Sequence, residues 1–548
     1  MSVYEIRPVS RPIRGVITPP GSKSISNRAL VCAAMATGDS RLIGLLDCDD
    51  TRVLRESLGR LGVRVFPDPV DPSVVTVHRP SDAWRPISRG LAKTPESAGP
   101  SQGATSGRAT SGGGTGLTGT EDSPDLTDVC TELFVGNSGT TIRFLMAMLS
   151  AGRGRYRLDG VARMRQRPLG DLVSALRSLG VSVCGENGGD HERGVSGGEG
   201  ICGKNDGDGG REYAPVLLDA NGLRGGDVWI RGDVSSQFLS GLLMAAPYAV
   251  ERPVGIRVTR NATGRVSLVS RPYVTMTLEV MRAFGVEVET DGELSQFVIP
   301  RTGYRGREYR IEPDASSASY FLAAAAITGG TVTIPGLSER SIQGDIRFAE
   351  VLERMGCRVQ WTEGERGGCV TLSGPEPGTR LRGIDVEMSD ISDTSQTLSV
   401  VAIFASGATR IRGVGNMRYK ETDRIAAVAT ELRRLGVSVT EYEDGLRIEP
   451  RGDGMCDPPY GDRDGDGELC TGRNGGGRRG RSGRNGWDGR VGESDSVTIR
   501  TYDDHRMAMS FALAGLRIPG VRIADPECVS KTYPNYFEDL AGVCEEDG

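Results

Sequence analysis

The sequence predicts an α/β protein of at least two domains, built from a repeated helix–strand unit. Two observations lead to this prediction. One pattern, an amphipathic helix followed by a glycine and a short valine-rich strand, occurs five times along the chain. The 548 residues are also too many for one hydrophobic core, because single cores stop growing at about 250–300 residues.

The repeated unit places Leu, Phe or Met one and four residues before a glycine, which is the spacing of one helical stripe. An arginine lies in the last helical turn, where a cation suits the helix dipole and the glycine can form a left-handed cap. Alternating valines after the glycine, such as Val63 and Val65, predict a strand. The stripe has one polar exception eight residues before the glycine, Thr277. The glycines are Gly62, Gly180, Gly285, Gly356 and Gly436, with Gly520 expected to mark a degenerate sixth copy.

Composition excludes several classes of function. A formal net charge of −6 gives no reason to expect a nucleic-acid partner or an anionic membrane surface. No apolar run predicts a membrane span, and we expect no targeting segment. Cys32, Cys184 and Cys357 fall in apolar patterns, so buried free thiols in a reducing cytosol are expected. The three histidines give little support to a histidine metal site, and we expect a cytoplasmic protein.

Three segments interrupt the repeated pattern. They are rich in Gly, Ser and charged residues and poor in core-forming residues, which predicts surface loops. The arginines of the third segment leave open a weak nucleic-acid tail, although interleaved Asp and Glu favour a solvated insert. The segments cover about residues 81–128, 186–211 and 451–494.

Seven short segments combine Lys or Arg with Gly, Ser, Asn or Asp where a loop leads into a helix. In the first, Ser24 or Ser26 is expected to cap a helix whose free backbone N–H groups favour an anion. Any one segment could be an ordinary solvated helix start. Their shared placement predicts a cleft for one or two multiply anionic ligands. The segments are residues 19–28, 136–143, 163–168, 235–238, 418–424, 503–509 and 530–534.

Nine segments, in order along the chain, resemble the 5-enolpyruvylshikimate-3-phosphate synthase family of enolpyruvyl transferases. They cover the chain apart from the three inserts. The segments are PPGSKSISNRAL, GNSGTTIRF, RMRQRPLGDLV, SSQFLSGLLMA, DASSASYFLAAAAI, QGDIRFAEVLERMG, YKETDRIAAVATELR, YDDHRMAMSFALAG and KTYPNYFEDL.

The resemblance implies two similar domains, each an inside-out α/β barrel of three helix–strand repeats. One domain would cover residues 23–311, and the other would combine residues 1–22 with 312–548. Two crossovers would form a hinge, and the active site would lie between the domains. A monomer is expected.

The resemblance also implies a reaction between shikimate 3-phosphate and phosphoenolpyruvate. The 5-hydroxyl attacks the enol carbon while the methylene is protonated, and the tetrahedral intermediate then loses phosphate. Both substrates are polyanions, which accounts for the cationic segments. No cofactor and no metal are expected.

Site residues follow from the resemblance position by position. The residues expected to bind shikimate 3-phosphate are Lys23, Ser24, Arg28, Ser235, Ser236, Gln237, Ser270, Tyr273, Asp393, Asn416 and Lys420. The residues expected to bind phosphoenolpyruvate are Lys23, Gly139, Arg163, Gln237, Arg424, Arg506 and Lys531. By the same resemblance the catalytic residues would be Asp393, which accepts the 5-hydroxyl proton, Glu421, which donates to the methylene, and Lys23, which reaches both substrates.

Two alternatives remain open at this point. One is UDP-N-acetylglucosamine enolpyruvyl transferase, although Val161–Arg167 lacks the cysteine that such enzymes commonly carry. The other is a non-catalytic anion-binding scaffold, which the presence of Lys23, Asp393 and Glu421 disfavours. Phe144 stands where many family members have proline, which puts inhibitor sensitivity in doubt more than activity.

Overall fold

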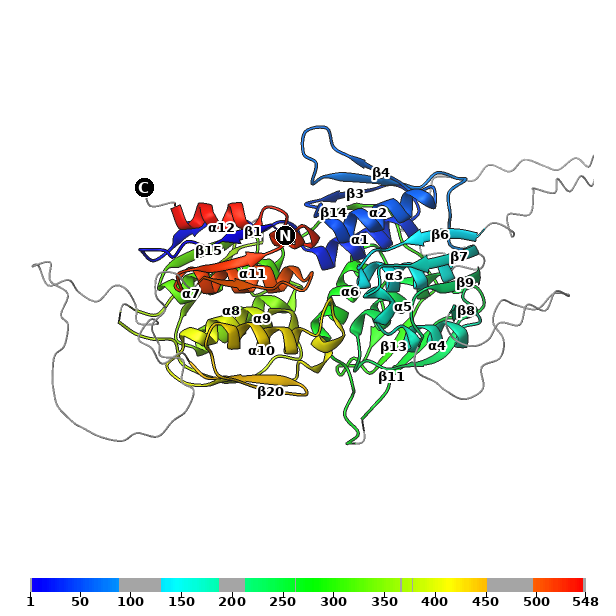
Figure 1. Cartoon of the computed structure of the whole chain (residues 1–548). Coiled ribbons are helices and arrows are strands. Elements are labelled where there is room, and N and C mark those ends of the chain that lie inside the picture. The colour runs from blue at the N-terminus through cyan, green and yellow to red at the C-terminus, as the bar shows by residue number, and fades with distance from the viewer. Residues whose placement is uncertain are drawn as a thin grey trace, which may run out of the picture.

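The structure is a computed structural model that describes residues 2–87, 130–186, 212–261, 263–364, 367–376, 378–450 and 496–545. Its helices and strands form two groups that lie side by side (Figure 1). The N-terminal strand joins the group that contains the C-terminal helix. The predicted inserts at about 81–128, 186–211 and 451–494 lie almost wholly outside the described residues.

Six sheets repeat one arrangement of strands. In five of them, two parallel strands are followed in the sheet by an antiparallel hairpin. The last strand of the hairpin pairs with the inner parallel strand, so in four of these sheets the order is first, second, fourth, third. In the fifth sheet the outer parallel strand, Glu308–Arg310, comes last in the chain. The predicted mixed α/β fold of repeated helix–strand units is therefore confirmed.

The first group of elements lies within residues 23–311 and contains three of the sheets. Their strands, in sheet order, are β14 (Glu308–Arg310), β3 (Ser40–Ile43), β5 (Val75–His78) and β4 (Arg64–Pro67); β6 (Cys130–Phe134), β7 (Arg153–Asp159), β9 (Val216–Asn221) and β8 (Ser182–Gly185); β10 (Gly226–Ile230), β11 (Val254–Val258), β13 (Gln296–Ile299) and β12 (Glu289–Thr290). Their helices are α1 (Lys23–Met35), α2 (Asp49–Arg60), α3 (Gly139–Ser150), α4 (Gly170–Ser178), α5 (Ser236–Ala245) and α6 (Arg271–Ala283).

The other three sheets belong to the second group. Their strands, in sheet order, are β2 (Arg14–Val16), β15 (Thr331–Pro335), β17 (Cys369–Ser373) and β16 (Arg358–Thr362); β18 (Asp385–Glu387), β19 (Thr409–Arg412), β21 (Gly445–Ile448) and β20 (Val439–Tyr442); β22 (Val497–Ile499), β23 (Val521–Ala524) and β1 (Val3–Glu5). Their helices are α7 (Ala315–Thr328), α8 (Phe348–Arg354), α9 (Ser395–Val401), α10 (Arg424–Arg434), α11 (His505–Gly515) and α12 (Tyr536–Glu545). Short 3₁₀ helices near the junction of the groups are η1 (Met164–Gln166), η3 (Gly344–Arg347), η4 (Ser392–Thr394), η6 (Gly415–Tyr419) and η7 (Pro526–Lys531).

One helix of each unit is buried on nearly all sides. These helices are α1, α3, α5, α7, α9 and α11. The buried apolar side chains form two separate clusters, one between Ile25 and Ile311 and the other from Ile6, Ile13 and residues 315–543. On this basis we propose domains at residues 23–311 and at 1–22 with 312–548. Closure of each domain into a barrel stays a prediction.

The predicted helix–glycine–strand copies are confirmed. The amphipathic helices α2, α4, α6, α8 and α10 each end just before the expected glycine, and each glycine has a positive φ. The polar exception in the stripe, Thr277, is fully buried and accepts a hydrogen bond from the guanidinium of Arg28 at 2.8 Å. A buried cation therefore explains why this position is polar.

The sixth unit combines both ends of the described chain. Strands β22 and β23 are parallel, and β1 pairs antiparallel with β23 where the other units have their fourth strand. Gly520 precedes β23 and so lies between the two helices of the unit. A helix, a glycine with positive φ and a strand follow one another here, as expected for a degenerate sixth copy. However, α11 is the buried first helix of its unit, whereas the other five glycines follow the second, amphipathic helix.

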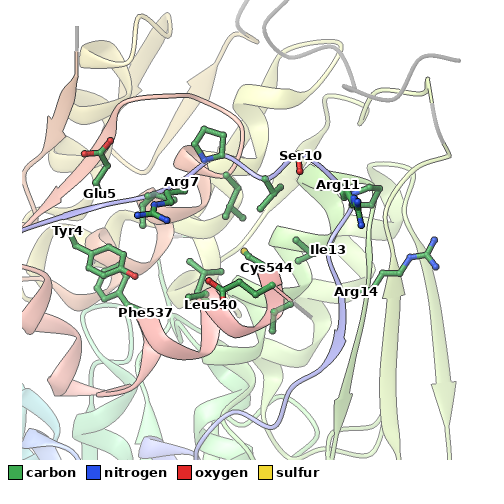
Figure 2. Close-up of a pocket in the computed structure, with 18 residues that line it drawn as sticks. Tyr4, Glu5, Arg7, Ser10, Arg11, Ile13, Arg14, Phe537, Leu540 and Cys544 are labelled. Carbon is green, nitrogen blue, oxygen red and sulfur yellow. The ribbon is translucent and has the colours of Figure 1, made fainter. Parts of the chain in front are cut away.

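A surface cavity of about 660 Å³ accompanies this arrangement. It lies between residues 4–14 and α12 (Figure 2). Tyr4 packs on Phe537 with ring centroids 4.5 Å apart at one end of the cavity. Among the described residues, the sheet has no strand in the third position of this unit, and the cavity lies beside α12.

The two crossovers between the groups run next to each other. The backbone N–H of Ser22 donates to the carbonyl of Glu312 at 2.8 Å, and that of Asp314 donates to the carbonyl of Pro20 at 2.8 Å. Asp314 also accepts from the backbone N–H of Lys23 at 3.1 Å. The start of α1 and the start of α7 are thereby fixed beside each other.

The cysteines expected to be buried free thiols differ in outcome. Cys32 and Cys357 are buried free thiols, as expected, whereas Cys184 is disulfide-bonded, so the expectation of a free thiol is wrong there. The other described cysteines are free. None of the described helices combines the length and the apolar character needed to cross a membrane.

Candidate active site

The N-terminal ends of the buried helices meet where the two groups of elements join. Lys23 opens α1, Gly139 opens α3, Gln237 lies in the first turn of α5, and Arg506 lies in the first turn of α11. All four line one narrow cavity. Free backbone N–H groups and the positive ends of helix dipoles favour anions at such a place.

The cavity is small because protein side chains fill the junction. Its volume is about 30 Å³, which leaves room for only a few water molecules. Its lining residues come from both groups: Lys23, Asp50, Gly139, Thr140, Arg167, Gln237, Asp393, Lys420, Glu421, Arg424 and Arg506. A larger ligand needs these side chains, or the two groups, to move.

Asp393 lies in η4 and is surrounded by cations of the second group. Its carboxylate is 3.0 Å from Arg506, 3.4 Å from Arg424 and 3.5 Å from Lys420. Burial opposes ionisation, but the attraction of Arg506, Lys420 and Arg424 outweighs it and holds the pKa of Asp393 well below its ordinary value. The carboxylate is therefore charged and held in place.

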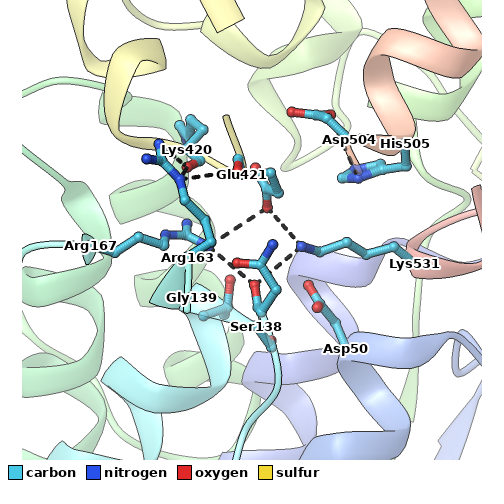
Figure 3. A network of polar contacts seen from close by, with 12 residues as sticks. Asp50, Ser138, Gly139, Arg163, Arg167, Lys420, Glu421, Asp504, His505 and Lys531 are labelled. Carbon is cyan, nitrogen blue, oxygen red and sulfur yellow. Dashed lines mark hydrogen bonds and ion pairs between the residues drawn. The ribbon is translucent and has the colours of Figure 1, made fainter. Parts of the chain in front are cut away.

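Glu421 precedes α10 and is the second carboxylate of the junction. It lies 2.8 Å from Arg424, 3.2 Å from Lys531 and 3.9 Å from Arg167. Burial again opposes ionisation, but Lys531, Arg424 and Arg167 lower the pKa of Glu421 well below its ordinary value. Figure 3 shows Glu421 between Lys531 and the arginines of the first group.

Arg424 and Arg506 are fixed by acids of the second group. Arg424 makes two hydrogen bonds to the buried Asp504, at 2.7 and 3.1 Å. Asp504 also caps α11 by accepting from the backbone N–H of Arg506 at 2.9 Å. Burial disfavours the charged form of Arg424, but Asp504, Glu421 and Asp393 raise its pKa above the ordinary value. Both guanidinium groups therefore stay charged at the junction.

Two cations cross between the groups. Arg163, just before η1, donates to the backbone carbonyls of Lys420 at 2.9 Å and Glu421 at 3.1 Å (Figure 3). Lys531 donates to the carbonyl of Asn137 at 3.1 Å. The two contacts run in opposite directions across the junction, so separation of the groups would break both.

Lys23 and Arg28 occupy different environments on α1. Lys23 lies 3.2 Å from Asp50; burial lowers the pKa of Lys23, but Asp50 and Glu421 raise it more, so the net shift is upward. Arg28 is 1% exposed, donates to Thr277 and Ser240, and lies 5.2 Å from the ring centroid of Phe144. Burial lowers the pKa of Arg28 to about 10. Phe144 thus contacts a residue predicted to bind shikimate 3-phosphate.

The cap of α1 differs from the predicted one. Ser22, not Ser24 or Ser26, is the N-cap residue, and its hydroxyl accepts from the backbone N–H of Ile25 at 3.5 Å. Ser26 instead accepts from the backbone N–H of Leu46. The helix begins at Lys23, which brings that side chain to the very end of the helix axis.

Several predicted residues of the first group stand around α5 and α6. Ser235 caps α5, Ser236 is buried, and Gln237 accepts from Arg143 at 2.6 Å and donates to Thr140 at 3.0 Å. Ser270 occupies the N-cap position of α6 in a left-handed conformation, without a capping hydrogen bond from its side chain. These side chains lie on helix starts that face the same junction.

Tyr273, Asn416 and Ser24 complete the predicted set. The Tyr273 hydroxyl lies 3.3 Å from Asp393, and burial followed by the nearby Asp345 and Asp393 charges raises its pKa well above the ordinary value. Asn416 donates to Ser392 at 3.4 Å. The carbonyl of Ser24 accepts from Arg28 at 2.9 Å.

Sequence reasoning missed several residues that line the cavity or support it. Arg167 is 3% exposed and lines the cavity, whereas Arg163, the predicted ligand, reaches the carbonyls of the other group. Asp50, Thr140, Asp345 and Asp504 were missed as well. The signal for Arg167 was present in the run of three arginines at 163–167, but the sequence does not tell which one faces the cavity.

Within the described residues, no cluster of His, Cys, Asp and Glu is arranged to hold a metal ion.

The chain matches one family model over most of its length. The model describes EPSP synthase (3-phosphoshikimate 1-carboxyvinyltransferase), and it matches residues 8–122, 117–200, 204–455 and 477–540. These ranges contain every predicted site residue.

Curated relatives cover the whole chain. A 3-phosphoshikimate 1-carboxyvinyltransferase of Nostoc punctiforme is 36% identical over 548 residues, which is 100% of both chains. One from Vibrio atlanticus is 37% identical over 98% of this chain and 99% of the relative.

Solved structures share the fold. An EPSP synthase of Acinetobacter baumannii superposes with a TM-score of 0.64 and 24% identity, and covers 99% of this chain and 98% of that one. The enolpyruvyl transferase NikO of Streptomyces tendae gives a TM-score of 0.60 at 18% identity, over 99% and 97% of the two chains. At these identities the likeness supports the arrangement of elements only.

Proposed function

The chain belongs to the EPSP synthase (3-phosphoshikimate 1-carboxyvinyltransferase) family, and from this premise we propose how its junction carries out that family's reaction. The enzyme transfers the enolpyruvyl group of phosphoenolpyruvate to the 5-hydroxyl of shikimate 3-phosphate and releases phosphate. One observation carries the proposal. Cations from both groups of elements surround Asp393 and Glu421, the two carboxylates that the chemistry requires.

Shikimate 3-phosphate would bind mainly to the starts of α1, α5 and α6. Lys23, Ser235 and Ser236 offer donors at helix N-termini, where a phosphate is favoured. Arg28 would meet the substrate from a buried position that Thr277 and Phe144 hold rigid. The remaining ligands are Ser24, Gln237, Ser270, Tyr273, Asn416 and Lys420.

Phosphoenolpyruvate would bind beside the first turn of α3. Gly139 brings the backbone close to the ligand, and Arg424, Arg506 and Lys531 supply charge from the second group. Arg163 and Gln237 complete the predicted set. We add Arg167, because its guanidinium lines the cavity and packs on Gly139: a Cβ atom at Gly139 would lie 2.4 Å from Nη2 of Arg167.

Asp393 is proposed to accept the proton of the 5-hydroxyl. With a strongly lowered pKa it is a weak base while its three cations remain paired with it. The phosphate and carboxylate groups of the substrates would draw charge from Arg506, Arg424 and Lys420, and the pKa of Asp393 would rise toward a value useful for proton transfer. The oxygen–carbon bond then forms as the proton moves to the carboxylate.

Glu421 is proposed to donate a proton to the methylene carbon in the same addition. Its own pKa is strongly lowered by Lys531, Arg424 and Arg167. An arriving phosphate that takes Lys531 and Arg167 would remove these partners and raise the pKa of Glu421. In the elimination, the carbon–oxygen bond to phosphate breaks, and the new methyl group returns a proton to a base. Glu421 would serve as that base.

The charges that line the cavity also support domain closure as part of the cycle. Since the cavity of about 30 Å³ cannot hold both substrates, the groups are proposed to separate for binding. Like charges repel across an open cleft, and two polyanions neutralise them, so substrate binding would favour closing. The adjacent crossovers at Ser22 and Glu312 would form the hinge.

Phosphate release from the purified protein tests the proposed function. We expect release only when shikimate 3-phosphate and phosphoenolpyruvate are both present, with one enolpyruvyl product formed per phosphate. UDP-N-acetylglucosamine in place of shikimate 3-phosphate serves as the alternative acceptor. Phosphate release with that acceptor alone would favour the alternative enolpyruvyl transferase, and tight binding without release would favour a scaffold.

We further propose that the protein acts as a monomer in the cytoplasm. The proposed site draws on two parts of a single chain, so it needs no second copy. Seven of the eight described cysteines are free thiols, which fits a reducing compartment, whereas the disulfide of Cys184 does not. Sedimentation at working concentration would test the monomer.

A further inference from the structure

The hydroxyl group of Tyr273 lies between two carboxylates. It is 3.0 Å from Oδ2 of Asp345 and 3.3 Å from Oδ2 of Asp393. A phenol has one proton to donate, so the two carboxylates compete for it. Asp393 is the proposed base, whereas Asp345 has so far had no role.

Asp345 differs from Asp393 in its partners. It lies in η3, is 3% exposed, and accepts a hydrogen bond from the Ser316 hydroxyl at the start of α7. Its Oδ1 atom is buried without a hydrogen-bond partner among the described residues. No Lys or Arg of the described chain lies within ion-pair distance of Asp345, whereas three cations hold Asp393. A buried carboxyl group without a cation is costly to ionise.

We propose that Asp345 is a positioning residue for the enolpyruvyl transfer. It acts through Tyr273 and sets how strongly the hydroxyl proton of Tyr273 is shared with Asp393. This inference rests on the proposed function of the same site. When Asp345 is ionised, it attracts the Tyr273 proton away from Asp393. Oδ2 of Asp393 is then free to accept the proton of the substrate hydroxyl, and the proposed base becomes stronger. No proton needs to leave Tyr273 or Asp345 in this step.

The charges around Asp345 fit a group that changes its ionisation near neutral pH. Burial, followed by the repulsion of Asp393, raises the pKa of Asp345 to about 6, while Arg506 of α11 and the Ser316 hydroxyl oppose the rise. Asp314, the cap of α7, adds a smaller repulsion, and Tyr273 faces Asp345 from α6. Protonation of Asp345 below this range would leave the Tyr273 proton to Asp393 and weaken the base.

The Asp345→Asn variant tests this inference because asparagine keeps the shape but carries no charge. We expect the ratio of wild-type to variant kcat to rise from about 1 at low pH to about 3–10 at pH 8, since a shift of up to one pKa unit in the base is worth at most tenfold. The midpoint should fall near pH 6, and KM for both substrates should change little. Taking the ratio at each pH removes the titration of the substrate phosphates, which lies in the same range.

Glu431→Gln is the matched control. Glu431 is fully buried and accepts from the Tyr502 hydroxyl at 2.7 Å, so it is also a carboxylate–phenol pair, but it lies outside the cavity. For Glu431→Gln, the ratio of wild-type to variant kcat should not vary with pH. A flat ratio for Asp345→Asn, or a change in KM with kcat unaltered, would overturn the inference.

Ser316→Ala keeps the test decisive if Asp345→Asn does not fold. The serine hydroxyl stabilises the charged carboxylate, so its loss should raise the pKa of Asp345. The acid limb of the pH profile of kcat should then move to higher pH by about half a pH unit to one unit. An unmoved acid limb in a folded Ser316→Ala protein would count against the inference.

If the wild type releases no phosphate, the proposed function fails, and carboxyl ¹³C resonances then decide on Asp345 separately. A signal titrating near pH 6 that disappears in Asp345→Asn but not in Glu431→Gln would support the coupling, and its absence from the wild type would refute it.

Discussion

The ammonium group of Lys531 lies 3.2 Å from Oε1 of Glu421. Lys531 also donates to the carbonyl of Asn137 in the other group of elements. One cation therefore joins the two groups and also neutralises the proposed proton donor. A phosphate that binds Lys531 would loosen both contacts, so ligand binding and the acidity of Glu421 are physically coupled.

Glu421→Gln should slow turnover by roughly 10²–10⁴-fold, because glutamine cannot donate a proton to the methylene. Deuterium entry into the methylene from heavy water should slow with it. If Glu421 only pairs with Lys531 and Arg424, the variant will lose stability while its folded fraction turns over at the wild-type rate. Phosphate release and mass spectrometry of the product distinguish these results.

Asp393→Asn should reduce kcat by roughly 10²–10⁴-fold through loss of the general base. Binding of shikimate 3-phosphate, measured by calorimetry, should weaken far less. The reason is that Arg506, Arg424 and Lys420 lose a competing anion and remain available to the substrate. A loss of binding as large as the loss of turnover would mean that Asp393 holds the site together and is not the base.

Gly139→Ala should raise KM for phosphoenolpyruvate and leave that for shikimate 3-phosphate nearly unchanged. The new methyl group would lie 2.4 Å from Nη2 of Arg167, so the guanidinium must shift. A displacement on the scale of one methyl group is worth about 1–3 kcal/mol. Gly59→Ala, where a Cβ atom meets nothing within 4 Å, is the control. Equal KM values for Gly139→Ala and wild type would remove Arg167 from the phosphoenolpyruvate site.

Small-angle scattering should show a smaller radius of gyration when shikimate 3-phosphate is added. Arg163→Ala should reduce this change, because Arg163 donates to carbonyl groups across the junction. Arg165→Ala is the matched control, since Arg165 pairs with Asp159 within its own group. A radius that stays constant up to saturating ligand would contradict closure about the crossovers.

His505→Gln should make the protein less sensitive to acid. Burial, together with Lys23 and Arg506, lowers the pKa of His505 well below its ordinary value, so the folded protein keeps this ring neutral. The unfolded chain binds a proton at pH values below about 6.5, and the stability from His505 is therefore present above that pH and lost as pH falls. The free energy of unfolding between pH 7 and 5 should drop less in the variant. Equal pH dependence of the free energy of unfolding in His505→Gln and wild type would contradict this account.

The helix–glycine–strand copies could be predicted from the sequence, because their signals are local. A stripe of apolar residues, a terminal arginine and a glycine such as Gly62 lie within one short window, and each has a direct conformational consequence. The charged helix starts at Lys23 and Arg506 were also visible, since a cation at a helix start is a local pattern. The resemblance to a known family then supplied the roles of these residues.

Tertiary structure alone decided which side chains meet. Asp345 and Asp393 are 48 positions apart and share the hydroxyl of Tyr273, and no local pattern relates these three residues. Packing also decided that Arg167 lines the cavity while Arg163 binds carbonyl groups of the other group. Similarly, β1 completes the sheet of β23 although the two strands lie at opposite ends of the chain. The sequence determined the elements and the charges, because these depend on neighbours along the chain. Partners and pKa shifts depend on distance in space and on burial, which only the folded arrangement of the two groups sets.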